Sequence, residues 1–395
     1  MKGAMKVPYC RIACDGNELA YLREVLESGW LTTGAKALEL ERRFAEAVGA
    51  GHAIAVNSCT SALHLALEAA GVKAGDEVFV PTMTFTASAE VVRYLNAHPV
   101  FLDVEYGTSL LTPAIVREAV RKHPGVKTLV VVHYGGQAAP MFGRDGEAGI
   151  LEICREHGIR VVEDAAHAFP TKLGGSMVGS IGDATCFSFY ANKTITTGEG
   201  GMLTTNDPAI AARARTMRLH GIDRVVWDRF TSAKPGWEYD VVAPGFKYNM
   251  PDVNAAIGLA QLERAWDFHR ERLRCARRYL RDLAGVPHLD LPVSHSALED
   301  QAWHLFPVVV GPGAPVGRDR LIERLAERGI GTSVHYRPLH RMSYYRDTYH
   351  LRPEDFPEAE RIWNGCLSLP IFPTLSDEEI GYVCGVLRDA LEGGT

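Results

Sequence analysis

A single lysine stands where the chain could present an amine to a bound molecule. Residues 186–190 form a short apolar and aromatic run, which predicts a buried strand. Lys193 follows this run and precedes a loop that contains Gly198, Gly200 and Gly201. Glycines allow positive φ and close approach of the backbone to a ligand. A lone loop lysine is most often only solvated, so a catalytic role needs a second group.

That second group is a carboxylate with a histidine three residues later. Residues 159–162 predict another buried strand, which leads into Asp164 and then His167. In an α/β chain, a carboxylate at the carboxyl end of a strand lies where ligands bind. Pyridoxal phosphate (PLP) needs a lysine for its Schiff base and an acid that keeps its pyridine nitrogen protonated. Lys193 and Asp164 together therefore predict a PLP site.

Length and composition exclude several classes of protein. The chain has 395 residues, enough for one large and one smaller domain, with 46% hydrophobic and 23% charged residues as in an ordinary soluble enzyme. A net charge of −6 without a long run of one sign argues against nucleic acid or an anionic membrane as partner. No apolar stretch could span a membrane and no apolar signal core opens the chain, so we expect a cytoplasmic protein.

The cysteines do not indicate disulfides or a metal. All eight are scattered, and several lie within apolar runs. Buried free thiols in a reducing compartment explain this distribution better than disulfides do. Cys10 and Cys14 are the closest pair, but no second pair completes a zinc set. We therefore expect no metal site.

The first half of the chain alternates apolar runs with amphipathic patterns. Strands are predicted at residues 53–56, 78–80, 100–104, 128–132 and 159–162, and helices at 18–28, 37–48, 62–70, from 87, 113–123 and 150–156. This alternation is typical of an α/β fold with a large, mainly parallel sheet covered by helices on both faces. Thr60, Phe85, Asp164 and Lys193 each follow a predicted strand, so we expect them to meet at one edge of the sheet.

Two polar stretches near the N-terminus each allow two interpretations. Residues 57–61 open a helix, where small polar side chains cap free N–H groups. The same N–H groups and the helix dipole form an anion site, which a PLP enzyme needs for its phosphate. Residues 28–34 carry Trp30 and two hydroxyls between glycines, and form either a surface turn or a pocket wall.

Beyond residue 205 the alternation fades and indicates a smaller C-terminal α+β domain. Asp252 is the expected cap of a long helix, and residues 223–245 form a mixed loop of a length that is often functional or an oligomer contact. We expect a large PLP-binding domain over residues 1–265 and a small domain over 266–395. Helices are predicted at 208–218, 252–280, 318–329 and 377–391, and strands at 287–291, 302–310 and 331–336.

Seven motifs, in order along nearly the whole chain, carry a family resemblance. They are SGWLTTG (28–34), NSCTSALHLAL (57–67), GDEVFVPTMTFTAS (75–88), VEDAAHA (162–168), GDATCFSFYANKTITTGEGG (182–201), GFKYNMPDVNAAIGLAQL (245–262) and GIGTSVHYRPLH (329–340). On these motifs the chain resembles the DegT/StrS sugar aminotransferases, PLP enzymes of the aspartate-aminotransferase fold (fold type I). His167, Tyr134 and AWHLF (302–306) resemble the subgroup of UDP-4-amino-4-deoxy-L-arabinose aminotransferase-like enzymes.

The resemblance implies a role for each catalytic group. Lys193 would form the Schiff base and shuttle the proton between the substrate carbon and the cofactor. Asp164 would pair with the pyridinium nitrogen, and His167 would touch the cofactor near its 3-hydroxyl. The related sugar dehydratases carry histidine at the position of Lys193, so the lysine argues against that activity.

The resemblance also implies the remaining contacts. The phosphate would be held by the N–H groups of Thr60 and Ser61 with the hydroxyl of Ser188, and Phe85 would stack on the ring. Asn249 would reach the phosphate of the other subunit, so a homodimer would share its active sites. The sugar nucleotide would face the remaining four positions, Trp30, Thr32, Thr33 and His335.

Two positions depart from the family pattern. Cys59 stands where glycine or alanine is usual, and a thiol is small enough to fit. Phe85 stands where some close relatives have tryptophan; it still stacks, with less area.

The activity implied is transfer of the amino group of L-glutamate to the C4 ketone of a nucleotide-linked keto sugar, UDP-linked in this subgroup. The product would serve cell-surface glycan, lipopolysaccharide or lipid A biosynthesis. The alternative is amination of a dTDP-keto-hexose at C3 or C4 for O-antigen or antibiotic sugars. A non-catalytic regulator that binds PLP or a sugar nucleotide is a further alternative. A nucleotide-binding ATPase or Rossmann domain is disfavoured, because the chain lacks GxxxxGK[ST] and a dinucleotide fingerprint after its first strand.

Overall fold

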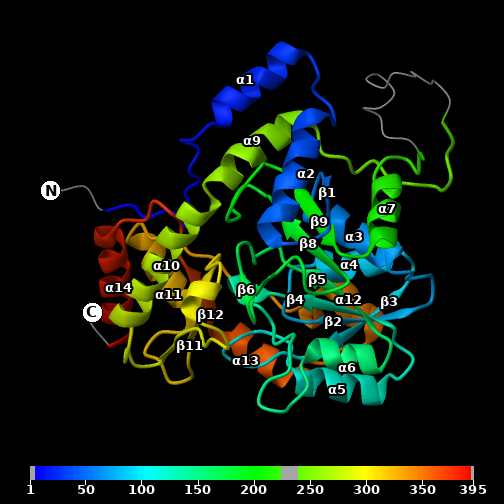
Figure 1. Ribbon diagram of the computed structural model, residues 1–395. Helices are drawn as coiled ribbons and strands as arrows, with labels where there is room; N and C mark the ends of the chain where they lie inside the picture. Colours follow the sequence, from blue (N-terminus) through cyan, green and yellow to red (C-terminus); the bar gives the residue numbers. More distant parts are fainter. Residues whose placement is uncertain (1–4, 224–238, 393–395) are drawn as a thin grey trace.

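Seven strands form the central sheet, in the order β1-β9-β8-β5-β4-β2-β3 (Figure 1). The protein is described by a computed structural model that covers residues 5–223 and 239–392. Five neighbouring strands are parallel, whereas β9 runs antiparallel to both β8 and β1, so the prediction of a mainly parallel sheet is confirmed. The strands are β1 His52–Val56, β2 Glu77–Pro81, β3 His98–Leu102, β4 Thr128–Val132, β5 Arg160–Asp164, β8 Ala184–Ser188 and β9 Gly201–Thr205.

Alternating side chains place a separate core on each face of this sheet. In β2, Phe79 belongs to one core, while Val78 and Val80 belong to the other. The first core is closed by α2 Ala35–Val48, α5 Pro113–Lys122, α6 Ile150–Glu156 and α9 Asp252–Glu263. The second is closed by α3 Cys59–Ala69, α4 Ala87–Tyr94 and α7 Pro208–Met217. Layers of helix, sheet and helix confirm the predicted α/β class.

The chain beyond α9 builds the smaller part of the molecule. A three-stranded antiparallel sheet of β10 Leu289–Asp290, β11 Phe306–Val310 and β12 Cys366–Leu369 packs against α10 Ala265–Asp282, α11 Arg318–Glu327 and α14 Asp377–Leu391. The predicted start of this domain at residue 266 falls beside the start of α10. The N-terminal segment joins it, because Val7 is buried in the same core and donates its N–H to Gly329.

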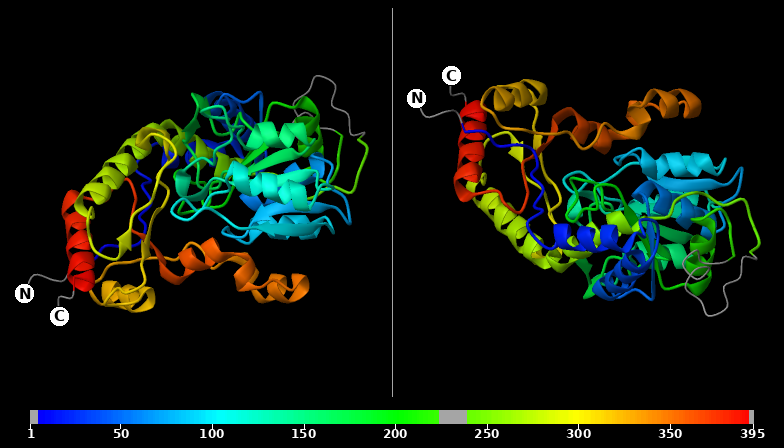
Figure 2. Two further views of the ribbon diagram at one scale, coloured as in Figure 1. Left: turned by 90° about the horizontal axis from the view of Figure 1, so that it is seen from below. Right: turned by 90° about the horizontal axis from the view of Figure 1, so that it is seen from above.

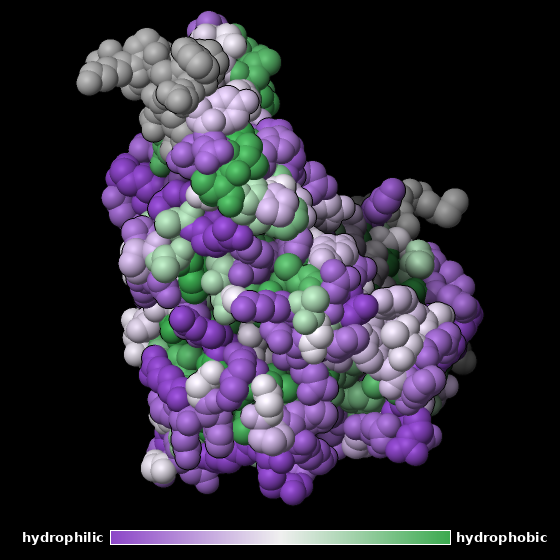
Figure 3. Space-filling view, turned by 90° about the vertical axis from the view of Figure 1, so that its right-hand side faces the viewer, coloured by the Kyte–Doolittle hydropathy of each residue, from purple (hydrophilic) through white to green (hydrophobic). Residues whose placement is uncertain are grey.

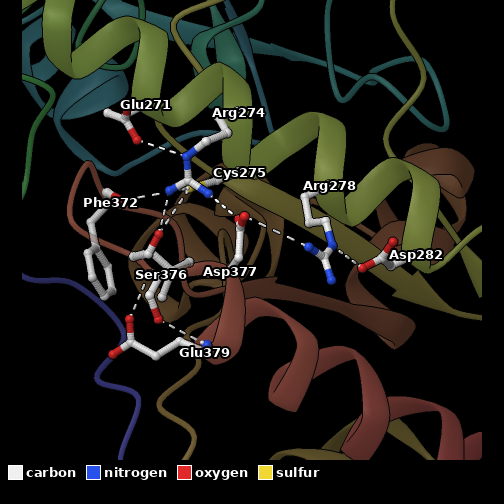
Figure 4. Close-up of polar contacts among 10 residues, drawn as sticks. Glu271, Arg274, Cys275, Arg278, Asp282, Phe372, Ser376, Asp377 and Glu379 are labelled. Atoms are coloured by element: carbon white, nitrogen blue, oxygen red, sulfur yellow. Dashed lines mark hydrogen bonds and ion pairs between the residues drawn. The ribbon is translucent and has the colours of Figure 1, made fainter.

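Ion pairs tie α10 to α14 at the surface of this small part (Figure 4). Arg274 contacts Glu271 on its own helix and Asp377 in the first turn of α14. Arg278 continues the series, pairing with Asp282 and lying 3.9 Å from Asp377. These side chains are substantially exposed, so packing of the apolar core carries most of the stability.

One C-terminal segment packs against the large sheet instead of the small one. Helices α12 Ser343–Tyr349 and α13 Pro357–Gly365 supply Tyr345 and Ile362 to the second core of the large sheet. Figure 2 shows this orange segment running from the small part along the large one. Residues distant in sequence therefore come close to the strand ends. The remaining short elements are the hairpin β6 Lys172–Leu173 and β7 Ser176–Met177, and 3-10 turns at Tyr134–Gly136, Leu298–Asp300, Leu339–Arg341 and Pro353–Asp355.

Three predictions about the elements are wrong. Residues 252–280 form two helices rather than one, since the helix stops at Arg264 and restarts as α10. Residues 331–336 form no strand, because only single bridges hold Ile330 to Val7 and Ser333 to Ser368. Asp252 does not cap its own helix; its carboxylate accepts from the N–H groups of Gly34, Lys36 and Ala37 and so caps α2. Most of the predicted loop at 223–245, residues 224–238, lies outside the described residues.

Candidate active site

A cavity of about 450 Å³ opens at the carboxyl ends of the parallel strands. Its floor is formed where β5 and β8 end and where α3 begins, as expected from the geometry of parallel sheets. Its opposite wall comes from the C-terminal segments, through His304, His335 and Tyr336. The cavity lies between the two parts of the molecule.

Lys193 lines this cavity, five residues beyond the end of β8. Its backbone N–H donates to the carbonyl of Tyr190, which fixes the turn that carries it. Burial lowers the pKa of Lys193 from its ordinary value of 10.5 to about 8, although Cys59 and the Asp164 carboxylate oppose part of this shift. A lysine with such a pKa exists partly as the neutral amine near pH 8, the form that attacks a carbonyl.

Asp164 is the last residue of β5 and is almost fully buried. One carboxylate oxygen accepts from the hydroxyl of Ser88 at 2.7 Å, and the other accepts from the N–H of Ala166 at 3.1 Å. Thr84 lies 2.8 Å behind Ser88 and continues the network. Each carboxylate oxygen can accept a further hydrogen bond, because it has a second lone pair. The group is thus held in place and able to accept from a ring N–H in the cavity.

The first turn of α3 forms one end of the cavity. Ser58, Cys59 and Thr60 line it, together with Ser188 at the end of β8. The N–H groups of Cys59 and Thr60 precede the first hydrogen bond of the helix, from the N–H of Ala62 to the carbonyl of Ser58. They therefore have no partner within the helix and suit an anion. Ser61 lies behind this turn, where its N–H donates to the hydroxyl of Ser58 and its hydroxyl to Asn57. The N–H of Ser61, which we expected to hold the phosphate, is therefore engaged in the cap, and anion binding by this turn stays a prediction.

His167 lies in the cavity wall with both ring nitrogens occupied by the protein. Nδ1 accepts from the N–H of Gly135 at 3.2 Å, which leaves the proton on Nε2, 2.9 Å from the hydroxyl of Tyr336. Burial lowers the pKa of His167 well below its usual range, and the Lys193 charge acts in the same direction. Its predicted contact with the cofactor near the 3-hydroxyl stays a prediction.

The opposite wall contains groups that we did not predict, Tyr336 and His304. The hydroxyl of Tyr336 meets His167, and the ring of His304 lies 4.5 Å from that of His167. Both residues belong to motifs that carry the family resemblance, His304 to 302–306 and Tyr336 to 329–340, and these motifs could have indicated them. Of the predicted residues, His335 does line the cavity; its Nδ1 lies 2.9 Å from Ser368, and burial lowers its pKa to about 4.

Phe85 lines the mouth of the cavity and is 57% exposed, an unusual position for an apolar ring. Its ring centroid lies 6.0 Å from that of Tyr336. An exposed phenylalanine beside an apolar partner provides a surface for a flat ligand. The stacking role predicted for this residue is compatible with this place.

Besides Ser61, four predicted residues do not line the cavity of their own chain. Asn249 donates to the hydroxyl of Thr33 at 2.8 Å, and that hydroxyl donates to the carbonyl of Met250 at 2.6 Å. Trp30 donates its indole N–H to the carbonyl of Thr33 at 3.1 Å, and Thr32 accepts from the N–H of Asp252. The four therefore form one cluster, at the turn between α1 Glu18–Ser28 and α2.

The residues of the cavity fit PLP. A reactive lysine, a fixed carboxylate, the first turn of a helix and an exposed aromatic ring surround one space. Within residues 5–223 and 239–392, no three His, Cys, Asp or Glu side chains gather as they would around a metal ion. Across the same residues, no helix is both long and apolar enough to cross a membrane.

Comparison with known proteins agrees with this geometry. The sequence model of the DegT/DnrJ/EryC1/StrS aminotransferase family matches residues 13–388. The chain is 42% identical over 389 residues to the spore coat polysaccharide biosynthesis protein SpsC of Bacillus subtilis (strain 168), across 98% of this chain and 97% of that protein.

Solved structures give the same result. The aminotransferase TlmJ from Streptoalloteichus hindustanus matches with a TM-score of 0.87 at 34% identity, over 98% of this chain and 99% of that chain. PseC of Helicobacter pylori, an aminotransferase involved in the biosynthesis of pseudoaminic acid, matches with a TM-score of 0.89 at 25% identity, over 98% and 100%. The chain therefore belongs to the DegT/DnrJ/EryC1/StrS aminotransferase family, and it is a PLP-dependent sugar aminotransferase.

Proposed function

We propose that this sugar aminotransferase moves the amino group of L-glutamate to the C4 ketone of a UDP-linked keto sugar. The observation that carries the proposal is Lys193, whose pKa of about 8 and place beside Asp164 suit amine chemistry in the cavity. The choice of C4 and UDP rests on the resemblance of His167, Tyr134 and residues 302–306 to that subgroup. The relative in Bacillus subtilis, which by its name serves a surface polysaccharide, supports a cell-surface glycan as the destination.

Each residue of the cavity has a separate role in this proposal. PLP, when bound, supplies an electron sink for the carbon that loses or gains a proton. Lys193 would hold it and, as a neutral amine, would accept and return that proton at the substrate carbon. Asp164, held by Ser88 and Ala166, would accept a hydrogen bond from the ring N–H and keep it protonated. Thr60 and Ser188 would hold the phosphate, and Phe85 would cover one face of the ring.

We further propose that the active unit is a homodimer in which Asn249 and Thr33 face the partner's cavity. Both residues lie outside the cavity of their own chain, in the cluster beside α1 and α2. Apolar side chains of this region are exposed, with Leu19 at 78%, Leu26 at 64% and Leu31 at 49%. Figure 3 shows apolar groups at the upper end of the molecule, the height at which α1 lies in Figure 1, within a mostly polar surface. Such exposed apolar side chains favour an interface.

Complementation of two inactive variants tests the shared site. Lys193→Ala and Asn249→Ala subunits, each inactive alone, are unfolded together and refolded as a mixture. A hybrid dimer then contains one intact site, so about a quarter of wild-type activity should return if subunits pair at random. Mixtures that stay inactive, with dimers shown by light scattering, would contradict a shared site.

Isotope transfer tests the reaction itself. The holoenzyme is incubated with [15N]L-glutamate and a panel of UDP- and dTDP-linked keto sugars, and the masses of the products are measured by mass spectrometry. We expect the 15N label in an amino sugar from a UDP-4-keto substrate and none with Lys193→Ala. Transfer only to dTDP-keto-hexoses would favour the alternative substrate class. Binding without transfer to any substrate would favour the regulator.

A further inference from the structure

The segment that carries His304 is fixed to the large part of the molecule through its backbone. Ala302 and Leu305 donate their N–H groups to the carbonyls of Gly136 and Gly135, at 2.9 and 3.1 Å. The carbonyl of His304 accepts from the guanidinium of the buried Arg272 at 3.3 Å. The position of the His304 ring is therefore set on both sides without any contribution from its own polar atoms.

Glycine at position 136 makes this approach possible. Its φ is +102°, a conformation that other residues rarely adopt. A Cβ at this position would lie 2.8 Å from the N of Trp303 and 3.0 Å from the N of His304. The close passage of residues 302–305 over the turn thus depends on the absence of a side chain here.

The His304 side chain makes no hydrogen bond within the described residues, although it is only 5% exposed. Its Nδ1 is sealed from solvent without a partner, whereas Nε2 is not among the sealed atoms and the residue lines the cavity. Its neighbour His167, 4.5 Å away, has both nitrogens occupied. Because Nδ1 stays enclosed, Nε2 is the atom that a ligand in the cavity can reach, and no described residue hydrogen-bonds to it. A ligand that enters the cavity can therefore serve as the partner of Nε2.

The charge state of His304 limits what that partner can be. Burial lowers its pKa well below the usual range, and the cationic neighbours Arg272 and Lys193 act in the same direction. The ring is therefore neutral, with one donor and one acceptor, and no protein contact selects its tautomer. A sugar hydroxyl, which can also donate and accept, matches such a group, and a carbonyl oxygen matches its donor form.

We propose that His304 is a specificity residue that contacts an oxygen of the sugar ring bound in the cavity. This inference rests on the proposed function only in that a nucleotide-linked sugar enters the cavity. Two other sources of an oxygen exist, the nucleotide and the cofactor, and the experiment separates them.

The test is binding to the PLP-loaded protein, measured by calorimetry with UDP-glucose and dTDP-glucose and with UDP and dTDP alone. His304→Phe keeps the ring and removes the nitrogens. It should weaken the sugar nucleotide by about three- to tenfold, the value of one hydrogen bond, and leave the free nucleotide unchanged. His304→Gln, which keeps a donor and an acceptor, should recover part of the loss. His269→Phe is the matched control, since His269 contacts the carbonyl of Gln301 outside the cavity.

A second readout excludes a purely structural role. Because His304→Phe removes an unpaired buried group, the variant without sugar nucleotide should melt at the same temperature as the wild type or higher. The PLP absorbance should be unchanged. Equal weakening of UDP and UDP-glucose, loss of the PLP band, or unchanged affinity for every ligand would each overturn the proposal. Wild-type protein that binds neither sugar nucleotide would overturn the proposed function as well.

Discussion

Asp164 and His304, on opposite walls of the cavity, differ in how their polar atoms are satisfied. At the ends of the strands, Asp164 is bonded by Ser88 and Ala166 before any ligand arrives. On the C-terminal wall, His304 is buried without a side-chain hydrogen bond in the described part of the chain. A carboxylate that is already held in the free protein suits a cofactor that stays, whereas an unpaired ring suits a substrate that comes and goes. We call the side of the cavity with Lys193 and Asp164 the cofactor wall, and the side with His304 the substrate wall.

Replacing Lys193 should have the largest effect, because no other lysine among the described residues lines the cavity. Lys193→Ala should lower turnover by about a thousandfold or more and abolish the visible band of attached PLP. Lys172→Ala, at an exposed lysine, is the control and should leave both unchanged. Near-normal turnover of Lys193→Ala in the isotope assay would contradict the assignment of Lys193 as the residue that binds PLP.

Adding a methyl group at Gly136 should damage the substrate wall selectively. Gly136→Ala places a Cβ against the backbone of residues 303 and 304 in a left-handed conformation, so the segment must shift. The free energy of unfolding should fall by about 1–3 kcal/mol, and the affinity for a sugar nucleotide should fall with it. Gly125→Ala, where a Cβ meets nothing within 4 Å, serves as the control. Undiminished sugar affinity would show that the 302–305 segment is not placed by this contact.

The pH dependence of PLP uptake should report the environment of Lys193. The neutral amine attacks, so the rate of covalent attachment should rise with pH about a midpoint near 8 rather than near the ordinary 10.5. The folded-state pKa lies below that of the unfolded chain, which therefore binds more protons between these values. The free energy of unfolding of the PLP-free protein should accordingly rise with pH across that window. A stopped-flow midpoint near 10 would contradict the burial of this amine.

The smallest effect is expected away from both walls. Asp377→Ala removes the contacts to Arg274 and Arg278 between α10 and α14 (Figure 4). Since these side chains are exposed, the free energy of unfolding should fall by less than about 1 kcal/mol, and less at high salt. Turnover should not change. Thermal unfolding measures the first effect and a kinetic assay the second. A large loss of turnover would mean that the contact between α10 and α14 affects the geometry of the cavity.

The cofactor wall could be predicted from the sequence because its residues follow strands with clear patterns. Asp164 ends β5, and Lys193 lies shortly after β8, so the sheet alone brings them together. The α/β class and most strands followed from the same alternation. The predicted strand at 331–336 was wrong, since this segment is joined to β12 by a single bridge, between Ser333 and Ser368.

The substrate wall could not be predicted in this way, since its position depends on contacts between distant segments. His304 reaches the cavity because Gly135 and Gly136, more than 160 residues earlier, bind its backbone. Likewise, Asp252 caps α2 across a separation of more than 200 residues, and nothing in its own helix indicates this. The stop at Arg264 has no glycine or proline to mark it.

The PLP site is tested by the absorbance of the purified protein with PLP, from the near-ultraviolet to the blue, before and after addition of L-glutamate. We predict a yellow band from PLP attached to Lys193, which shifts when glutamate donates its amine. A protein that stays colourless after incubation with PLP would contradict the assignment of Lys193 and Asp164. It would instead favour the non-catalytic regulator.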